Sequence, residues 1–176
     1  MRFVPTAVEG AFIVELEPQI DDRGSFARTF CETEFAAAGI DFRPVQLNLS
    51  RNPRGNTLRG LHLQNDPHGE AKLVQCVRGQ IFDVAVDLRP ASPTFRAHAT
   101  VELDANEDWL FYIPQGCAHG FLTLAADSDV LYHMGTAFVP GVARGVRWDD
   151  PAFDIAWPVR PKVISDRDAS WPDFVT

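Results

Sequence analysis

Side chains that could do chemistry occur in four segments that otherwise have the apolar character of buried strands. The segments carry His62 in NTLRGLHLQ, Lys72 in GEAKLVQ, His119 in PQGCAHGF and Tyr132 in LYH. Histidine titrates near neutral pH and is a common general base, lysine brings a positive charge, and tyrosine is a weak acid. Each residue also has an ordinary structural interpretation, as a hydrogen-bonded histidine, a charge at a strand end or a core tyrosine. Together they are candidates for the lining of an internal cavity.

A glycine interrupts the first of these segments. Strict alternation would leave Arg59 and His62 on opposite faces of a strand. A bulge at Gly60 would shift the phase and bring the two side chains together, which is a usual role for a glycine inside a strand.

The histidines could instead belong to a metal site of the kind that holds iron, manganese or zinc in small β-barrels. The candidate ligands are His62, His68, Glu70 and His119. Two residues argue against this alternative. Gln64 stands where such a barrel would carry its second histidine, and Lys72 would repel a cation. We therefore expect no metal, and a metal-dependent enzyme is the weaker interpretation.

Short segments with a period of two predict the elements that must position these residues. In Ile81 to Leu88 the apolar side chains share one face, whereas Asp83 and Asp87 lie on the other. Arg96 to Leu103 alternates in the same way, and Trp109 to Ile113 is typical of a buried strand. Many short strands between turn signals indicate a β-sandwich or barrel.

Little of the chain is predicted to be helical. Glu32 to Ala38 is the only good helical stretch, and Gly39 is a plausible cap at its C-terminal end. Neither an internal repeat nor a linker is visible, so we expect one domain over residues 1–176. The less regular segment from about Trp148 onward is expected to wrap the barrel.

Composition excludes several classes of protein. The chain has 176 residues, of which 45% are hydrophobic, and a formal net charge of −8, which disfavours nucleic-acid binding through bulk charge. The three cysteines are widely spaced, as expected for reduced thiols in the cytoplasm; they are Cys31, Cys76 and Cys117. The sequence shows neither the apolar region of a signal peptide nor a membrane span, so we expect a cytoplasmic protein with no membrane partner.

Seven motifs in order resemble the dTDP-4-dehydrorhamnose 3,5-epimerase family of the cupin superfamily. They are DDRGSFARTF (21–30), VQLNLSRNPRGNTLRGLHLQ (45–64), GEAKLVQCVRGQIFDVAVDLRPASPTF (69–95), IPQGCAHGFL (113–122), LYHMGTAFVPG (131–141), RGVRWDDP (144–151) and ISDRDAS (164–170). The resemblance implies a cupin-like jelly-roll antiparallel β-barrel with a few short peripheral helices. It also implies an epimerase without a cofactor, which inverts C3, C5 or both in a nucleoside-diphosphate 4-keto-6-deoxyhexose. A non-catalytic protein that binds a sugar nucleotide is the alternative from another class.

The resemblance also assigns roles in proton transfer. It makes His62 the base and Asp168 the partner that orients its imidazole, with Asp83 and Asp166 as rival partners. Lys72 would stabilise the enolate oxygen, and Tyr132 would return a proton to the opposite face of the ring.

The substrate contacts that the resemblance implies come from many parts of the chain. They are Arg23, Phe26, Arg28, Gln46, Asn48, Arg59, His119, Phe138 and Arg167. Phe138 stands where a tyrosine is usual and Arg167 where a lysine is usual. Arg28 and Ala143 each replace a glutamate that is common in the family, so the nucleotide stays open. The resemblance further implies a homodimer, with Gly10 to Leu16 crossing to the neighbouring subunit.

Overall fold

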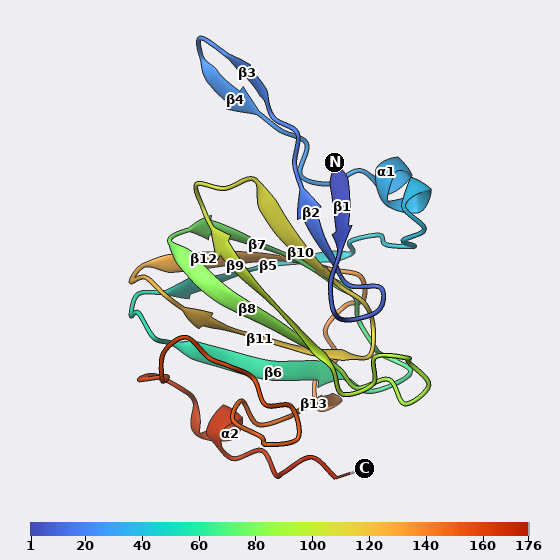
Figure 1. Cartoon of the computed structure of the whole chain (residues 1–176), viewed down its shortest axis with the longest axis vertical. Helices are drawn as coiled ribbons and strands as arrows, with labels where there is room; N and C mark the ends of the chain where they lie inside the picture. The colour runs from blue at the N-terminus through green and yellow to red at the C-terminus, as the bar shows by residue number, and fades with distance from the viewer. Residues whose placement is uncertain (176) are drawn as a thin grey trace.

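Two antiparallel sheets face each other in the computed structural model, which describes residues 1–175 (Figure 1). The first sheet has the order β1 (Arg2–Pro5), β2 (Phe12–Glu15), β10 (Trp109–Ile113), β7 (Lys72–Arg78), β12 (Ser128–Met134) and β5 (Gln46–Asn52). The second has the order β13 (Ala143–Gly145), β6 (Leu58–Gln64), β11 (Cys117–Thr123), β8 (Gln80–Asp87) and β9 (His98–Asp104). The remaining elements are the hairpin of β3 (Gln19–Asp21) and β4 (Gly24–Phe26) and two short helices, α1 (Glu32–Ala37) and α2 (Asp166–Ala169). The prediction of an all-β fold with a few short helices is confirmed.

The space between the sheets is filled at one side and open at the other. Apolar side chains such as Ile81, Val101 and Phe111 fill the region under β8, β9 and β10. Burying each such side chain contributes about 1.5–3 kcal/mol, so this packed half anchors the barrel. The strands β5, β6, β7, β11 and β12 instead line a cavity with polar groups.

The two faces of strand β8 could be predicted from the sequence, but which face points into the barrel could not. Phe82, Val84 and Val86 pack beneath the C-terminal segment, in a cluster with Phe153 and Trp157. The opposite face, which carries Asp83 and Asp87, is the one that points between the sheets, and both carboxylates are 0% exposed. The polar face predicted for this strand is therefore interior.

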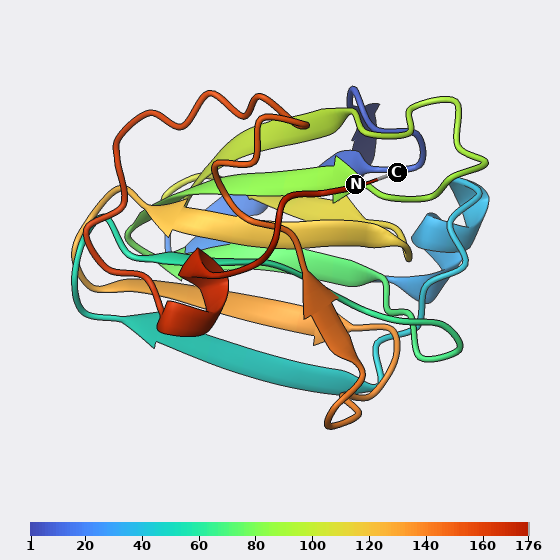
Figure 2. The same cartoon turned by 90° about the horizontal axis from the view of Figure 1, so that it is seen from below.

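The C-terminal segment crosses the outer face of the five-stranded sheet, as predicted (Figure 2). It is held to β6 by an isolated parallel bridge between Thr57 and Val163 and by a 2.8 Å hydrogen bond from Leu58 N to Val163 O. This bridge positions the following helix, α2, beside the cavity. Across residues 1–175, no helix has the length and apolar character to cross a bilayer.

The N-terminal region corrects one prediction. Gly10 to Leu16 does not leave the molecule, because β2 pairs with β1 and β10 of its own chain and Val14 is 0% exposed. The segment that projects from the barrel is the β3–β4 hairpin (Figure 1). Helix α1 ends at Ala37, one residue before the predicted end, and is followed by Gly39 with φ +77°.

The predicted irregularity at Gly60 is present. His62 pairs with His119 and Arg59 pairs with Phe121, so two residues of β6 lie opposite the single residue Gly120. Gly60 has φ +123°, and a Cβ there would lie 2.5 Å from Gly120 Cα. The shift in register lets Arg59 and His62 line the same cavity.

We expect Gly60→Ala to lower the free energy of unfolding by about 3 kcal/mol or more, because it adds a steric clash to an unfavourable φ. Urea unfolding followed by circular dichroism measures this loss. Gly24→Ala is the matched control, since Gly24 has φ +126° but nothing within 4 Å of its Cβ position. A loss no larger than that of Gly24→Ala, about 1 kcal/mol, would contradict the role of close packing.

Candidate active site

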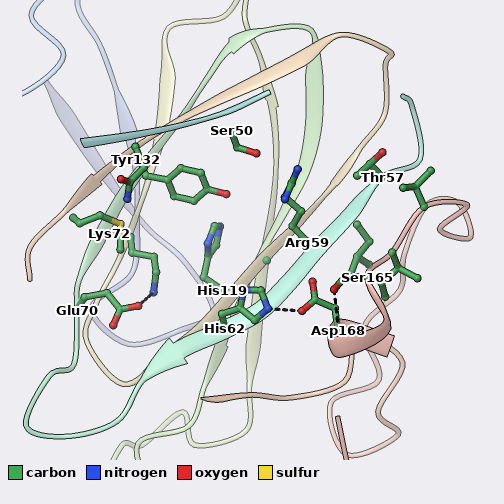
Figure 3. A pocket seen from close by; sticks show the side chains of 16 residues that line it. Ser50, Thr57, Arg59, His62, Glu70, Lys72, His119, Tyr132, Ser165 and Asp168 are labelled. Atoms are coloured by element: carbon green, nitrogen blue, oxygen red, sulfur yellow. Dashed lines mark hydrogen bonds and ion pairs between the residues drawn. The ribbon is translucent and has the colours of Figure 1, made fainter. Parts of the chain in front are cut away.

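A cavity of about 550 Å³ opens between the two sheets, beside the C-terminal segment (Figure 3). Its volume falls in the range of small-molecule sites. Seven of the residues predicted to be catalytic or to bind substrate line it: Asn48, Arg59, His62, Lys72, His119, Tyr132 and Asp168. They come from both sheets and from α2, so the fold brings together segments that are distant in the sequence.

His62 is paired with Asp168. The distance from His62 Nε2 to Asp168 Oδ1 is 2.6 Å, and Asp168 Oδ2 accepts a 3.2 Å hydrogen bond from Gly60 N. Ser165 caps α2 and accepts a 3.1 Å hydrogen bond from Asp168 N. Asp168 is 5% exposed, and the hydrogen bonds of its two carboxylate oxygens with His62 and Gly60 N fix it where it orients the imidazole.

The surroundings of Asp168 favour its ionised form. Burial acts to raise the pKa of this carboxyl, but the hydrogen bond and charge of His62, with the donors Gly60 N and Ser165, outweigh burial and lower the pKa. A carboxylate that is ionised near neutral pH stabilises a positively charged imidazole. The rivals are placed elsewhere: Asp83 contacts His119, and Asp166 is an exposed residue in the first turn of α2.

A second histidine–aspartate pair lies deeper in the barrel. His119 Nε2 is 2.5 Å from Asp83 Oδ1, and His119 is 4% exposed. Asp83 Oδ1 also accepts a 3.1 Å hydrogen bond from Val84 N. The inward carboxylate of β8 therefore fixes the ring of His119 at the cavity wall.

Lys72 lies at the start of β7 with its ammonium inside the molecule. Its Nζ is 2.5 Å from Glu70 Oε1, and the two side chains are 6% and 4% exposed. Within the described chain, Nζ has no hydrogen-bond partner apart from this ion pair. A buried ammonium with unused donors is suited to stabilise negative charge on a ligand oxygen.

Tyr132 faces His62 across the cavity, since it belongs to β12 of the other sheet (Figure 3). Its ring lies edge-on to His119, with ring centroids 5.7 Å apart. Burial, and to a smaller extent the charge of Asp83, raise the pKa of Tyr132 well above its ordinary value. The hydroxyl therefore keeps its proton at neutral pH.

We expect the tyrosines of the folded chain to resist ionisation. The chain has two, and burial raises the pKa of Tyr112 to about 12 and that of Tyr132 further. The unfolded pKa is about 10, so this contribution to stability is complete below pH 10 and is lost as the pH rises through 12. An absorbance titration at 295 nm checks this, with urea-unfolded protein as the control. A midpoint near pH 10 with unchanged circular dichroism would contradict it.

Arg59 lies at the mouth of the cavity with an exposed side chain. Its Nε donates a 2.7 Å hydrogen bond to Asn52 Oδ1, and Asn52 Nδ2 donates a 3.0 Å hydrogen bond to Ser128 O. Asn52 is 1% exposed, so its hydrogen bond holds the guanidinium from the buried side. A fixed guanidinium is suited to bind a phosphate.

Three predicted contacts lie outside this cavity in the single chain. Arg23 and Phe26 are on the projecting β3–β4 hairpin, and Phe26 is 79% exposed. Arg28 turns to α1, where its Nη1 is 2.6 Å from Glu34 Oε1. One chain therefore does not bring these side chains to the other site residues.

Three more lie at the periphery. Gln46 Oε1 accepts a 3.0 Å hydrogen bond from Phe138 N, so these two residues hold each other beside the cavity rather than line it. Phe138 is 58% exposed. Arg167 is exposed on α2, where its guanidinium lies 5.2 Å from the centre of the Trp171 ring.

The alternative metal site does not match the geometry. Gln64 is fully engaged, because its side chain donates to His68 O and Ala137 O and accepts from Val139 N. Glu70 is paired with Lys72. In residues 1–175, no group of three or more histidine, cysteine, aspartate or glutamate side chains is arranged to hold a metal ion.

Sequence reasoning missed supporting residues. Ser165 has a recognisable signal, since a serine three residues before an acid is typical of a helix N-terminus. Asn52 has none, because its contacts with Arg59 and Ser128 depend on how the strands pair. Ser50 and Thr57 also line the cavity without having been singled out.

Comparison with known proteins places this geometry in a family. The family model described as dTDP-4-dehydrorhamnose 3,5-epimerase matches residues 5–176. The chain belongs to the dTDP-4-dehydrorhamnose 3,5-epimerase family. The chain is 44% identical to the enzyme of that name from Methanothermobacter thermautotrophicus, over 97% of this chain and 92% of the relative.

Solved structures of the dTDP-4-dehydrorhamnose 3,5-epimerase family share the fold. The crystal structure from Elizabethkingia anophelis has a TM-score of 0.95 and 34% identity, over 99% of this chain and 96% of that one. The structure from Bacillus anthracis, with TDP and PPi bound, has a TM-score of 0.94 and 34% identity, over 98% of this chain and 99% of that one. The predicted cupin-like jelly roll is confirmed.

Proposed function

We propose that this protein is an isomerase that inverts C3, C5 or both in a dTDP-linked 4-keto-6-deoxyhexose by proton transfer. One observation carries the proposal: the His62–Asp168 pair and the protonated Tyr132 lie on opposite walls of one cavity, with Lys72 beside them. Inversion at carbon requires a base on one face of the ring and an acid on the other.

The first step removes a proton. His62 accepts it from a ring carbon next to the C4 ketone, and the electron pair moves to form an enolate with its charge on the C4 oxygen. The carboxylate of Asp168, 2.6 Å from His62 Nε2, stabilises the imidazolium that results.

The second step stabilises the enolate and completes the inversion. Lys72 donates hydrogen bonds to the C4 oxygen from inside the cavity wall, where low polarity strengthens them. Tyr132 then gives its proton to the opposite face of the same carbon. Exchange with water returns a proton to Tyr132 and removes one from His62, so no redox cofactor is required.

The diphosphate is proposed to lie at the mouth of the cavity. Arg59 provides an exposed guanidinium there, backed by Asn52, and Asn48 lines the same cavity beside Tyr132. His119, fixed by Asp83, contacts the sugar. Ala143 and Arg28 replace glutamates that are common in the family. The nucleobase of the substrate is therefore the part of the ligand whose recognition is least defined by these residues.

Hydrogen exchange tests this function. The protein is incubated with dTDP-4-keto-6-deoxyglucose in deuterated buffer, and the C3 and C5 proton signals are followed by NMR. Loss of both signals supports a 3,5-epimerase, and loss of one identifies the carbon that reacts. Binding of the substrate without exchange would replace the proposal with a non-catalytic binding protein. Stoichiometric metal in elemental analysis, together with loss of exchange on chelation, would favour a metal-dependent enzyme.

We also propose a homodimer in which each β3–β4 hairpin completes the nucleotide site of the partner subunit. Arg23 and Phe26 are exposed at a position that the cavity of their own chain does not reach. Val45, Leu47 and Leu49 give the edge strand β5 and the residue before it an exposed apolar surface that a second copy would cover.

A mixing experiment checks the shared site. We expect light scattering to give the mass of two chains, and both His62→Ala and the double variant Arg23→Ala/Phe26→Ala to be impaired. Unfolding and refolding the two together should restore up to about one quarter of the wild-type activity, because mixed dimers then contain one complete site. A monomer mass, or no recovery, would contradict the proposal.

We propose that the enzyme acts in the cytoplasm. We also propose that residues 1–176 form one domain. Free thiols at all three cysteines support a reducing compartment.

A further inference from the structure

Glu70 is a buried carboxylate at the wall of the cavity that the proposed reaction does not use. Its Oε1 lies 2.5 Å from Lys72 Nζ, and both residues are 5% exposed (Figure 3). Glu70 lies two residues before Lys72, which is the first residue of β7. The carboxylate therefore lies beside Lys72, which lines the same cavity.

The other oxygen of Glu70 is held by the opposite sheet. Its Oε2 accepts a 3.0 Å hydrogen bond from Gln64 N on β6. The side chain of Gln64 is itself bound to the backbone at His68, Ala137 and Val139. Glu70 is thus held by β6 through one carboxylate oxygen while the other oxygen pairs with Lys72.

Lys72 needs such an anchor. Its side chain has four rotatable bonds, and burying an ammonium is costly unless it is paired. Apart from Glu70, its Nζ has no polar partner within the described residues. The ion pair holds the ammonium at one point while leaving donors free for a ligand.

We propose that Glu70 is a positioning residue, which compensates the charge of Lys72 and fixes its Nζ where the substrate oxygen gains charge. This proposal rests on the proposed epimerase function. It assigns Glu70 no contact with the reacting atoms, so its effect should pass entirely through Lys72.

Glu70→Gln tests the proposal by removing the charge while keeping the shape. We expect kcat for deuterium incorporation to fall about 10- to 100-fold, as for other residues that orient a catalytic group. KM and the Kd for TDP should change less than about threefold, because interactions made only in the transition state act on kcat. Glu102→Gln, on the exposed face of β9, is the matched control and should behave as wild type.

A double-mutant cycle separates positioning from a general structural role. If Glu70 acts through Lys72, adding Glu70→Gln to Lys72→Met should reduce kcat by less than about twofold beyond Lys72→Met. Independent effects that multiply would overturn the proposal, as would a Glu70→Gln variant with kcat within twofold of wild type. Glu70→Asp, which keeps the charge but shortens the reach, gives the same test if Glu70→Gln does not fold, with an expected loss of kcat.

A readout that does not depend on activity keeps this inference separate from the epimerase proposal. The chain has two lysines, Lys72 and Lys162, so protein labelled with ¹³C-lysine gives two Cε signals. Glu70→Gln should move the Lys72 signal and leave that of Lys162 in place. An unmoved Lys72 signal overturns the positioning role even if exchange is observed. A moved signal in a protein without exchange would support the positioning role while the epimerase function fails.

Discussion

Replacing His62 by asparagine is expected to reduce deuterium incorporation at the reacting carbons by about 1,000-fold, in the range that general bases contribute. In the proposed mechanism the imidazole is the base, and Asp168, at 2.6 Å from it, assists it. A 1,000-fold loss corresponds to about 4 kcal/mol of transition-state stabilisation. Single-turnover NMR in deuterated buffer, with the Kd for TDP measured alongside, gives both quantities.

The His62 prediction has a matched control on the same sheet. His98→Asn changes a histidine of β9, which is separated from β6 by β11 and β8, and should leave exchange unchanged. Asp168→Asn should be less harmful than His62→Asn, with a loss of about 100-fold, because the base remains. Exchange within tenfold of wild type in His62→Asn would show that another group removes the proton.

Replacing Tyr132 by phenylalanine is expected to separate exchange from inversion. His62 can still remove a proton, exchange it with solvent and return deuterium to the same face of the ring. Formation of the epimer should fall by about 100- to 1,000-fold, since the acid on the opposite wall is lost. Deuterium incorporation should fall less than tenfold. NMR follows both in one sample, because the epimers have different ring couplings.

Tyr112→Phe is the control for this variant. Tyr112 is the other tyrosine and packs against Phe35 and Phe42 on the outer side of the six-stranded sheet, away from the cavity. It should keep both exchange and inversion. If Tyr132→Phe lost exchange and inversion in equal measure, Tyr132 would have a role in removing the proton rather than returning it.

Local patterns determined much of this protein. Alternation located β8 and β9, a run of large apolar residues located β10, and the glycine in β6 marked its bulge. The spacing of Ser165 and Asp168 is that of a helix start, although it was not used in the prediction. These features depend on neighbouring residues and backbone conformation, so a sequence contains them directly. The order of seven motifs added the family and, through it, candidate residues that the cavity brings together.

Only the tertiary structure decided which of these residues meet. The sequence left Asp83, Asp166 and Asp168 as possible partners of His62, and the contact spans 106 positions. The parallel bridge at Val163 places Asp168 next to His62, whereas Asp83, on the inward face of β8, contacts His119. Strand pairing and the covering of one sheet face set these distances, and both arise from burial summed over the whole chain, which no local pattern specifies.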